Sequence, residues 1–137
     1  MLGTLGGKET FAGGMNEKGQ VVGDSTTRKQ EKRAFSWRDG KMKNLGILPG
    51  FVSSQAYAIN NQGQIIGRVQ TDTDQRPAVW LSGKLYDLNT LIPPDSGWGL
   101  GGVSAINDKG QIVGTGLING ASHAFLLTPF AAPNLKK

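Results

Sequence analysis

Few side chains in this sequence could carry acid–base or metal chemistry, and they stand apart from one another. The only histidine is His123, and there is no cysteine. No acid–base or nucleophilic partner can be named for His123, so we interpret it as structural. Asp72 and Asp74 offer oxygen ligands that suit calcium, but their segment lacks the glycine and the distal glutamate of a calcium loop. We therefore expect a flexible acidic loop there, no enzyme activity, and no metal or cofactor.

Glycine pairs could instead cradle a phosphate, because glycine-rich loops bring backbone N–H groups close to an anion. Such pairs occur at Gly6-Gly7, Gly13-Gly14 and Gly101-Gly102. None is followed by the Gly-Lys-Ser/Thr sequence of a phosphate loop, and none leads into a predicted helix. We therefore expect the three pairs to mark turns.

One tryptophan is a candidate for partner binding. Trp98 lies in a Pro- and Gly-rich stretch, 93–99, which is about three residues longer than its counterpart in the preceding part of the chain. Loops of this kind often carry function on a rigid scaffold. Two roles remain open for Trp98: contact with a ligand or partner, and cover for an exposed sheet edge. Trp37 and Trp80 occupy equivalent positions, and we expect both to lie in the core.

Positive charge gathers in the first third of the chain. The formal net charge is +5, and residues 1–45 hold nine basic and five acidic side chains. Much of this excess comes from Arg28, Lys29, Lys32 and Arg33. Such a patch can attract phosphate or acidic partners. The segment contains Glu31 and no interleaved aromatic residue, which favours a solvated, charge-rich loop. We expect residues 26–33 to project as a mobile loop, with nucleic-acid or nucleotide binding as the alternative.

The elements that must position these residues repeat along the chain. A nine-residue phrase occurs at 15–23, 59–67 and 106–114, with offsets of 44 and 47 residues. Repeats of this period are typical of solenoids and propellers. The 21 glycines disfavour helices, and the clusters of Val, Ile, Phe and Trp between them favour short strands. The sequence therefore predicts an all-β fold.

The middle repeat gives the clearest prediction of the unit. We expect Asn60 to begin a turn and Gly63 to adopt positive φ, as in a type I turn closed by a glycine bulge. In the third repeat, Asn119-Gly120 predicts a two-residue hairpin. Each repeat is expected to be a four-stranded antiparallel meander, the size of a propeller blade. The strands predicted in the middle repeat are 55–59, 64–69, 78–81 and 84–88, with a polar loop at 70–76.

The repeats account for the whole chain as a single domain of 137 residues. The predicted blades are about 2–45, 46–88 and 89–128, followed by a tail at 129–137. The last blade is expected to be incomplete, because Pro129 and Pro133 interrupt a fourth strand. Rings usually need four to eight blades, so we expect a homo-oligomer, most simply a dimer with six blades in one ring. A β-sandwich and an open β-solenoid remain alternatives.

Three phrases in fixed order resemble the bacterial HAF repeat family. They are Leu2-Gly3-Thr4-Leu5-Gly6-Gly7, the phrase at 106–114, and His123-Ala124-Phe125-Leu126. Arg33 and Pro77 stand where the family has histidine, and Leu127 stands where tryptophan is usual. The resemblance implies a propeller-like β repeat, often found in secreted or surface-anchored bacterial proteins. It implies no reaction and no catalytic residues.

Three functions follow as hypotheses. The leading one is a non-enzymatic interaction module that self-associates through blade faces and presents loops, including Trp98, to a protein or glycan partner. The second is nucleic-acid or nucleotide binding through Arg28–Arg33. The third is a hydrolase, which would need acid pairs or a metal site that we do not find.

The sequence also bears on location. No apolar run reaches the roughly 20 residues that span a bilayer, so we expect no membrane insertion, and the N-terminus lacks the pattern of a signal peptide. The family resemblance implies a secreted or cell-surface protein, whereas a native start at Met1 would imply the cytoplasm.

Overall fold

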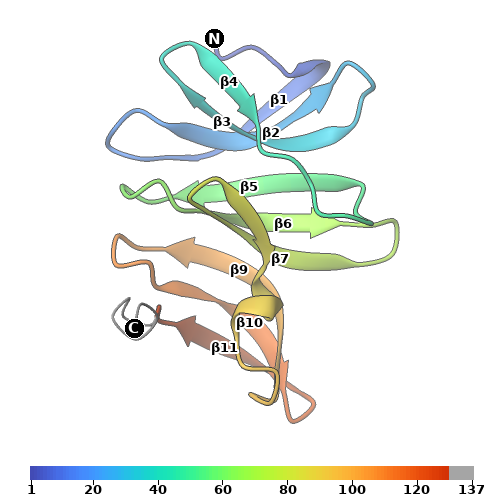
Figure 1. Cartoon of the computed structure of the whole chain (residues 1–137), viewed down its shortest axis with the longest axis vertical. Helices are drawn as coiled ribbons and strands as arrows, with labels where there is room; N and C mark the ends of the chain where they lie inside the picture. The colour runs from blue at the N-terminus through green and yellow to red at the C-terminus, as the bar shows by residue number, and fades with distance from the viewer. Residues whose placement is uncertain (130–137) are drawn as a thin grey trace.

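The computed structural model describes residues 1–129 and contains three antiparallel β-sheets, stacked along the long axis of the molecule (Figure 1). The first sheet has the strand order β1 (Gly6–Met15), β2 (Val21–Thr27), β3 (Lys32–Arg38), β4 (Lys41–Asn44). The second has the order β5 (Ser53–Ile59), β6 (Ile65–Gln70), β7 (Gln75–Leu81), β8 (Lys84–Asp87). The third has the order β9 (Trp98–Ile106), β10 (Ile112–Ile118), β11 (Ala121–Leu127).

Helical structure is slight in the described part of the chain. It consists of one 3₁₀ helix, η1 (Leu88–Leu91), which follows β8. None of the described residues forms a helix that is long and apolar enough to cross a membrane.

Consecutive strands pair with one another in every sheet, which confirms the predicted all-β fold and its antiparallel meanders. None of the sheets formed by the described residues closes on itself. Within residues 1–129 the third sheet has three strands, in line with the expected incomplete last repeat. The polar loop predicted at 70–76 is too long. Gln75 and Arg76 pair with Gln70 and Val69, so the connection shortens to 71–74.

The turn predictions are confirmed by the backbone angles. Gly63 has φ of +82°, and its N–H donates to the Asn60 carbonyl oxygen at 3.1 Å. Asn119 and Gly120 have φ of +53° and +76° and join β10 directly to β11. Both residues at the centre of such a hairpin must have positive φ, which explains the Asn-Gly sequence.

The glycine pairs, in contrast, lie within strands, so their assignment to turns is wrong. Gly6-Gly7 begins β1, Gly13-Gly14 lies near its end, and Gly101-Gly102 lies inside β9. A Cβ atom on Gly13 would overlap the carbonyl oxygen of Ala56, and one on Gly14 would lie 3.1 Å from Ala58 Cα. Glycine is needed at this pair because β1 of the first sheet approaches β5 of the second at close range.

Two hydrophobic clusters hold the stack together, one in each space between sheets. Side chains alternate along β6, so Ile65 packs with the first sheet and Ile66 with the third. Trp80 is 2% exposed, and its indole Nε1 donates to the Leu45 carbonyl oxygen at 3.0 Å. The core position expected for Trp80 is therefore confirmed. Trp37 is only partly buried, because no further sheet among residues 1–129 covers the outer side of the first one.

The last glycine of each repeated phrase faces an irregularity in the neighbouring strand. A Cβ atom on Gly67 would overlap the Gln55 carbonyl oxygen, and Gly23 and Gly114 show the same close approach to β1 and β9. The register between β5 and β6 shifts at this point. A side chain at Gly67 would therefore force the two strands apart.

We expect Gly67→Ala to lower the free energy of unfolding by roughly 2–4 kcal/mol, because the overlap is with backbone and cannot relax by a rotamer change. Gly102→Ala is the matched control. Gly102 lies in β9, has no atom within 4 Å of an added Cβ, and should change stability by less than about 0.5 kcal/mol. Denaturant unfolding measures both. Equal losses in the two variants would contradict the close approach.

Candidate interaction surfaces

Each nine-residue phrase folds into a turn organised by its asparagine side chain. Asn60 Oδ1 accepts from the backbone N–H groups of Gln62 at 3.0 Å and Gln64 at 2.9 Å. Asn60 Nδ2 donates to Gln64 Oε1 at 2.7 Å. Asn16 and Asn107 make the same three bonds in their own turns. The turn therefore depends on a side chain that both donates and accepts.

These asparagines also join one sheet to the next. Asn16 Nδ2 donates to the Asn60 carbonyl oxygen at 3.0 Å, and Asn60 Nδ2 donates to the Asn107 carbonyl oxygen at 2.9 Å. We call Asn16, Asn60 and Asn107 the asparagine ladder. Asn16 and Asn60 are 8% and 4% exposed, so loss of a partner would leave a buried polar group unpaired. Such a loss costs about 1–3 kcal/mol.

The residue after each asparagine forms a second row of bonds in the same direction. The Glu17 N–H donates to Asn61 Oδ1 at 2.8 Å, and the Asn61 N–H donates to Asp108 Oδ1 at 2.8 Å. Asn61 Nδ2 also donates to Asp108 Oδ2 at 2.9 Å. The backbone bond and then the side-chain bond from Asn61 lower the pKa of Asp108 below its ordinary value. In both rows each sheet donates to the sheet that follows it.

The ladder is incomplete at both ends of the stack. Within residues 1–129, Asn107 Nδ2 donates only inside its own turn, and Asn107 is exposed. At the opposite end, the Asn16 carbonyl oxygen accepts only from the Gly19 N–H of its own turn, at 3.3 Å, among the described residues. One end therefore offers an amide donor, and the other offers a carbonyl acceptor.

The outer face of the third sheet is apolar and exposed. Val113, Leu117 and Leu126 are 40%, 56% and 59% exposed. Ile66 and Val79, which correspond to Val113 and Leu126 in the second sheet, are 0% and 1% exposed because the third sheet covers them. The third sheet thus presents to solvent the kind of surface that the second sheet buries.

The outer side of the first sheet is uncovered in the same way. Met15 is 66% exposed, whereas Ile59, its counterpart in the second sheet, is 8% exposed. Trp37 is partly buried, whereas Trp80 is almost fully buried. The two ends of the stack therefore expose opposite faces of the same repeated sheet.

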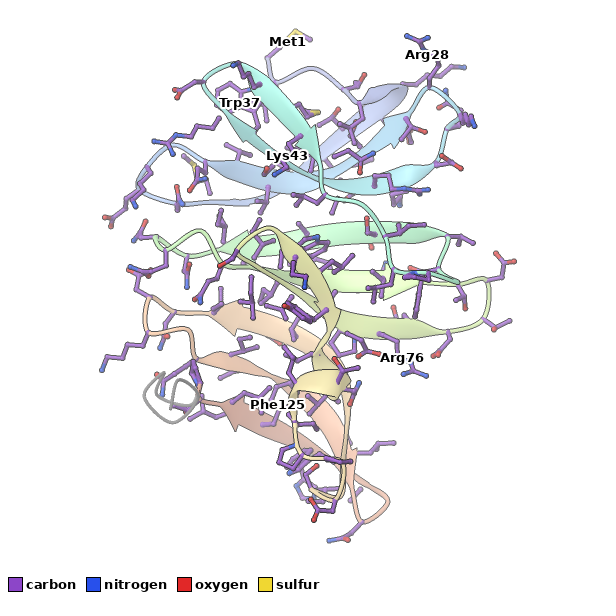
Figure 2. The ribbon with its side chains drawn as sticks, viewed as in Figure 1. Met1, Arg28, Trp37, Lys43, Arg76 and Phe125 are labelled. Carbon is purple, nitrogen blue, oxygen red and sulfur yellow. The ribbon has the colours of Figure 1, made fainter. Side chains whose placement is uncertain are left out.

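The basic segment is a strand–turn–strand hairpin, so the expected projecting loop is wrong for half of it. β2 continues to Thr27 and β3 begins at Lys32, which leaves only residues 28–31 in the turn. Arg28 and Lys29 are exposed in that turn. Figure 2 shows Arg28 at the edge of the molecule, on the side of the first sheet. Lys32 is exposed on β3. β-branched Thr26 and Thr27 favour extending the strand.

Arg33 has a different role from the other three basic residues. Its side chain is 13% exposed, and Nη1 donates to the Val52 carbonyl oxygen at 2.9 Å, at the entrance to β5. Its Nη2 lies 3.5 Å from Glu31 Oε1. Arg33 therefore ties the first sheet to the segment that enters the second.

Asp24 is the buried acid between the first and second sheets. Gln55 Nε2 lies 3.5 Å from its Oδ1. Burial raises the pKa of Asp24 above its ordinary value, and Lys32, Gln55 and Arg68 offset this in part. A raised folded pKa means that Asp24 favours the fold at low pH, and that this contribution is lost as the pH rises through the raised value. Among residues 1–129 the side chain that donates to Asp24 is the Gln55 amide.

Trp98 begins β9 and is partly buried. Its ring lies 6.2 Å from the ring of Phe125 with an interplanar angle of 72°, an edge-to-face contact. The two rings border a cavity of about 260 Å³ that Ile92, Pro93 and Leu127 also line. Trp98 therefore packs on the third sheet and at the same time forms the wall of a small apolar cavity.

The remaining sequence candidates do not come together. His123 is exposed on β11, and Asp72 lies in the turn between β6 and β7. Asp74 pairs with Arg76 at 2.9 Å. Within residues 1–129 no three His, Cys, Asp or Glu side chains gather closely enough to hold a metal ion.

The sequence analysis did not predict the asparagine ladder, because it assigned asparagine a role in turns alone. The sequence nevertheless contains a pattern that indicates the ladder. Asparagine recurs at the second position of all three phrases, and the next residue always has a side-chain acceptor: Glu17, Asn61 and Asp108.

Comparisons of the chain with protein-family models, curated proteins and solved structures give no match. The class that the structure defines is an all-β protein of three stacked antiparallel sheets.

We expect Asn60→Ala to lower the free energy of unfolding by about 3 kcal/mol, because it removes the turn bonds and the bond to the third sheet from a buried site. Asn107→Ala removes the same turn bonds from an exposed site and should cost about 1 kcal/mol. Chemical unfolding measures the loss in both variants, and the difference between the two losses gives the contribution of the bond between sheets. If both substitutions cost the same, the ladder does not stabilise the stack.

Proposed function

We propose that the chain is a non-enzymatic interaction module of the β-propeller type, similar to HAF repeats. In this proposal the sheets are blades, and copies of the chain associate head to tail to complete a ring. The assembled ring presents its loops to a protein or glycan partner. The observation that carries the proposal is the asparagine ladder, which repeats the same contact between sheets and leaves its donor and acceptor at opposite ends.

Head-to-tail association would satisfy both ends at once. Asn107 of one copy would donate to the Asn16 carbonyl oxygen of the next, as Asn60 donates to Asn107 within the chain. The apolar face of Val113 and Leu126 would pack on the outer side of the first sheet, around Trp37. The pair Ile66 and Val79 packs on the third sheet in this manner. Rings of four to eight blades are usual, so two copies with three sheets each give an acceptable number.

The mass in solution tests self-association. Light scattering at micromolar concentration should give a particle of twice the 14.5 kDa chain mass. Leu126→Arg should give a monomer, because it places a charge in the centre of the proposed contact. Val52→Arg is the matched control, because Val52 is 51% exposed at the entrance to the second sheet, and this variant should remain a dimer. A wild-type monomer, or an unchanged mass for Leu126→Arg, would contradict the proposal.

A second candidate function is polyanion binding by the basic hairpin. Glu31, the one acid of the segment, is paired with Arg33, so Arg28 and Lys29 stand exposed without a neutralising partner among residues 1–129. Two adjacent cations of this kind suit phosphate groups.

We expect, under this second function, that replacing Arg28 and Lys29 with serine weakens binding to a fluorescent single-stranded DNA and lowers the salt slope by roughly 1–1.5. The control replaces Lys41 and Lys43, exposed on β4, and removes the same charge. Equal weakening in both double variants would show attraction by net charge alone. No binding by the wild type in low salt would exclude the function.

A further inference from the structure

The third sheet ends one strand earlier than the other two in the described part of the chain. β4 pairs with β3 and β8 pairs with β7, whereas β11 pairs only with β10 among residues 1–129. Trp37 lies opposite Met42, and Trp80 lies opposite Leu85. The corresponding residue of β11 is Leu127. The free edge of a strand presents unpaired N–H and C=O groups to any chain that can pair with it.

The turn that produces β4 and β8 cannot follow β11. Asp39 and Ser82, the first residues of these turns, have φ of +52° and +51°. Pro129 stands at the corresponding position, two residues after Leu127. The proline ring holds φ near −65°, so this two-residue hairpin is excluded. The edge of β11 is therefore not covered by a hairpin of the kind seen in the first two sheets.

An apolar crevice lies beside this edge. The cavity of about 260 Å³ next to Trp98 adjoins a second cavity of about 350 Å³, and Ile92, Pro93 and Leu127 line both. Figure 2 shows Phe125 on the third sheet, close to the segment that follows η1. The crevice is thus bounded by the third sheet on one side and by the chain that leads into β9 on the other.

The second sheet shows what fills the corresponding place. There Leu85 of β8 packs with Leu45, Leu48 and Phe51 against the cluster that contains Trp80. The fourth strand therefore supplies an apolar side chain to the space between its own sheet and the incoming linker. In the third sheet the corresponding place is a cavity.

We infer that the edge of β11 and this crevice bind an extended peptide segment of a partner protein. The segment would pair antiparallel with β11 and place one apolar side chain, opposite Leu127, in the crevice. Its pattern would be that of β4 and β8, in which lysine, an apolar residue, a polar or aromatic residue, and Asn or Asp follow one another. Backbone bonds would supply affinity, and the apolar side chain would supply specificity. This inference rests on the proposed interaction function and names the class of its partner.

A labelled peptide with the sequence of residues 84–91 is the probe, used with the full chain. Fluorescence anisotropy should show saturable binding. Replacing the leucine that corresponds to Leu85 with aspartate should weaken it at least tenfold. Two further peptides each carry one backbone N-methyl group, at successive residues. One of them should not bind and the other should bind normally, because only alternate N–H groups of an added strand face β11. Equal effects of the two N-methyl groups would overturn strand pairing.

Variants of the protein locate the site. Leu127→Glu should weaken binding at least tenfold, whereas Leu117→Glu, on the outer face of the same sheet, should not change it. If Leu127→Glu fails to fold, the N-methylated peptides still decide the question. No binding by the wild type would overturn the inference and leave the dimer result standing. Val113 lies on the outer face and lines neither cavity, so peptide binding that is lost in Val113→Arg in step with the dimer would place the peptide between copies and would also overturn the inference.

Discussion

One side-chain amide, that of Asn60, has two tasks that the rest of the structure depends on. Its oxygen closes the turn between β5 and β6, and its nitrogen bonds the carbonyl oxygen of the next sheet's turn. Aspartate lacks the donor, and serine is too short to serve both partners. Every buried side-chain nitrogen or oxygen among residues 1–129 has a hydrogen-bond partner, so the bonds of the ladder offset the cost of removing its amides from water.

The direction of the ladder gives the stack its polarity. Each sheet donates to the following sheet, and the alternation on its strands gives it two different apolar faces. Within residues 1–129 only the middle sheet has both faces covered, with Ile65 on one side and Ile66 on the other. The first and third sheets keep one face each exposed to solvent. A further sheet can therefore pack on the exposed face at either end of the stack. Closure into a ring is the arrangement that would cover both of these faces.

Local chemistry allowed the turns to be predicted, and longer-range contacts explain what was missed. Gly63 and Asn119-Gly120 follow from the φ values that tight turns require, and Pro129 excludes after β11 the two-residue turn that follows β3 and β7. Gly13-Gly14 looked like a turn because its need for glycine arises from β5, more than 40 residues away in sequence. Arg33 looked like a solvated charge because its partner, the Val52 carbonyl oxygen, lies 19 residues further along the chain, just before β5 of the second sheet. The propeller ring and the HAF resemblance remain proposals.

Disulfide trapping between copies tests the central claim, that the ladder continues from one chain to the next. The chain has no cysteine, so Glu17→Cys and Asp108→Cys introduce unique thiols at the two open ends of the second row. Mixed and mildly oxidised, the two variants should form a cross-linked dimer, while neither should cross-link alone. Asn61→Cys with Asp108→Cys in one chain is the positive control, because the Asn61 N–H donates to Asp108 Oδ1 at 2.8 Å. A control that closes its disulfide while the mixture stays monomeric would contradict the account.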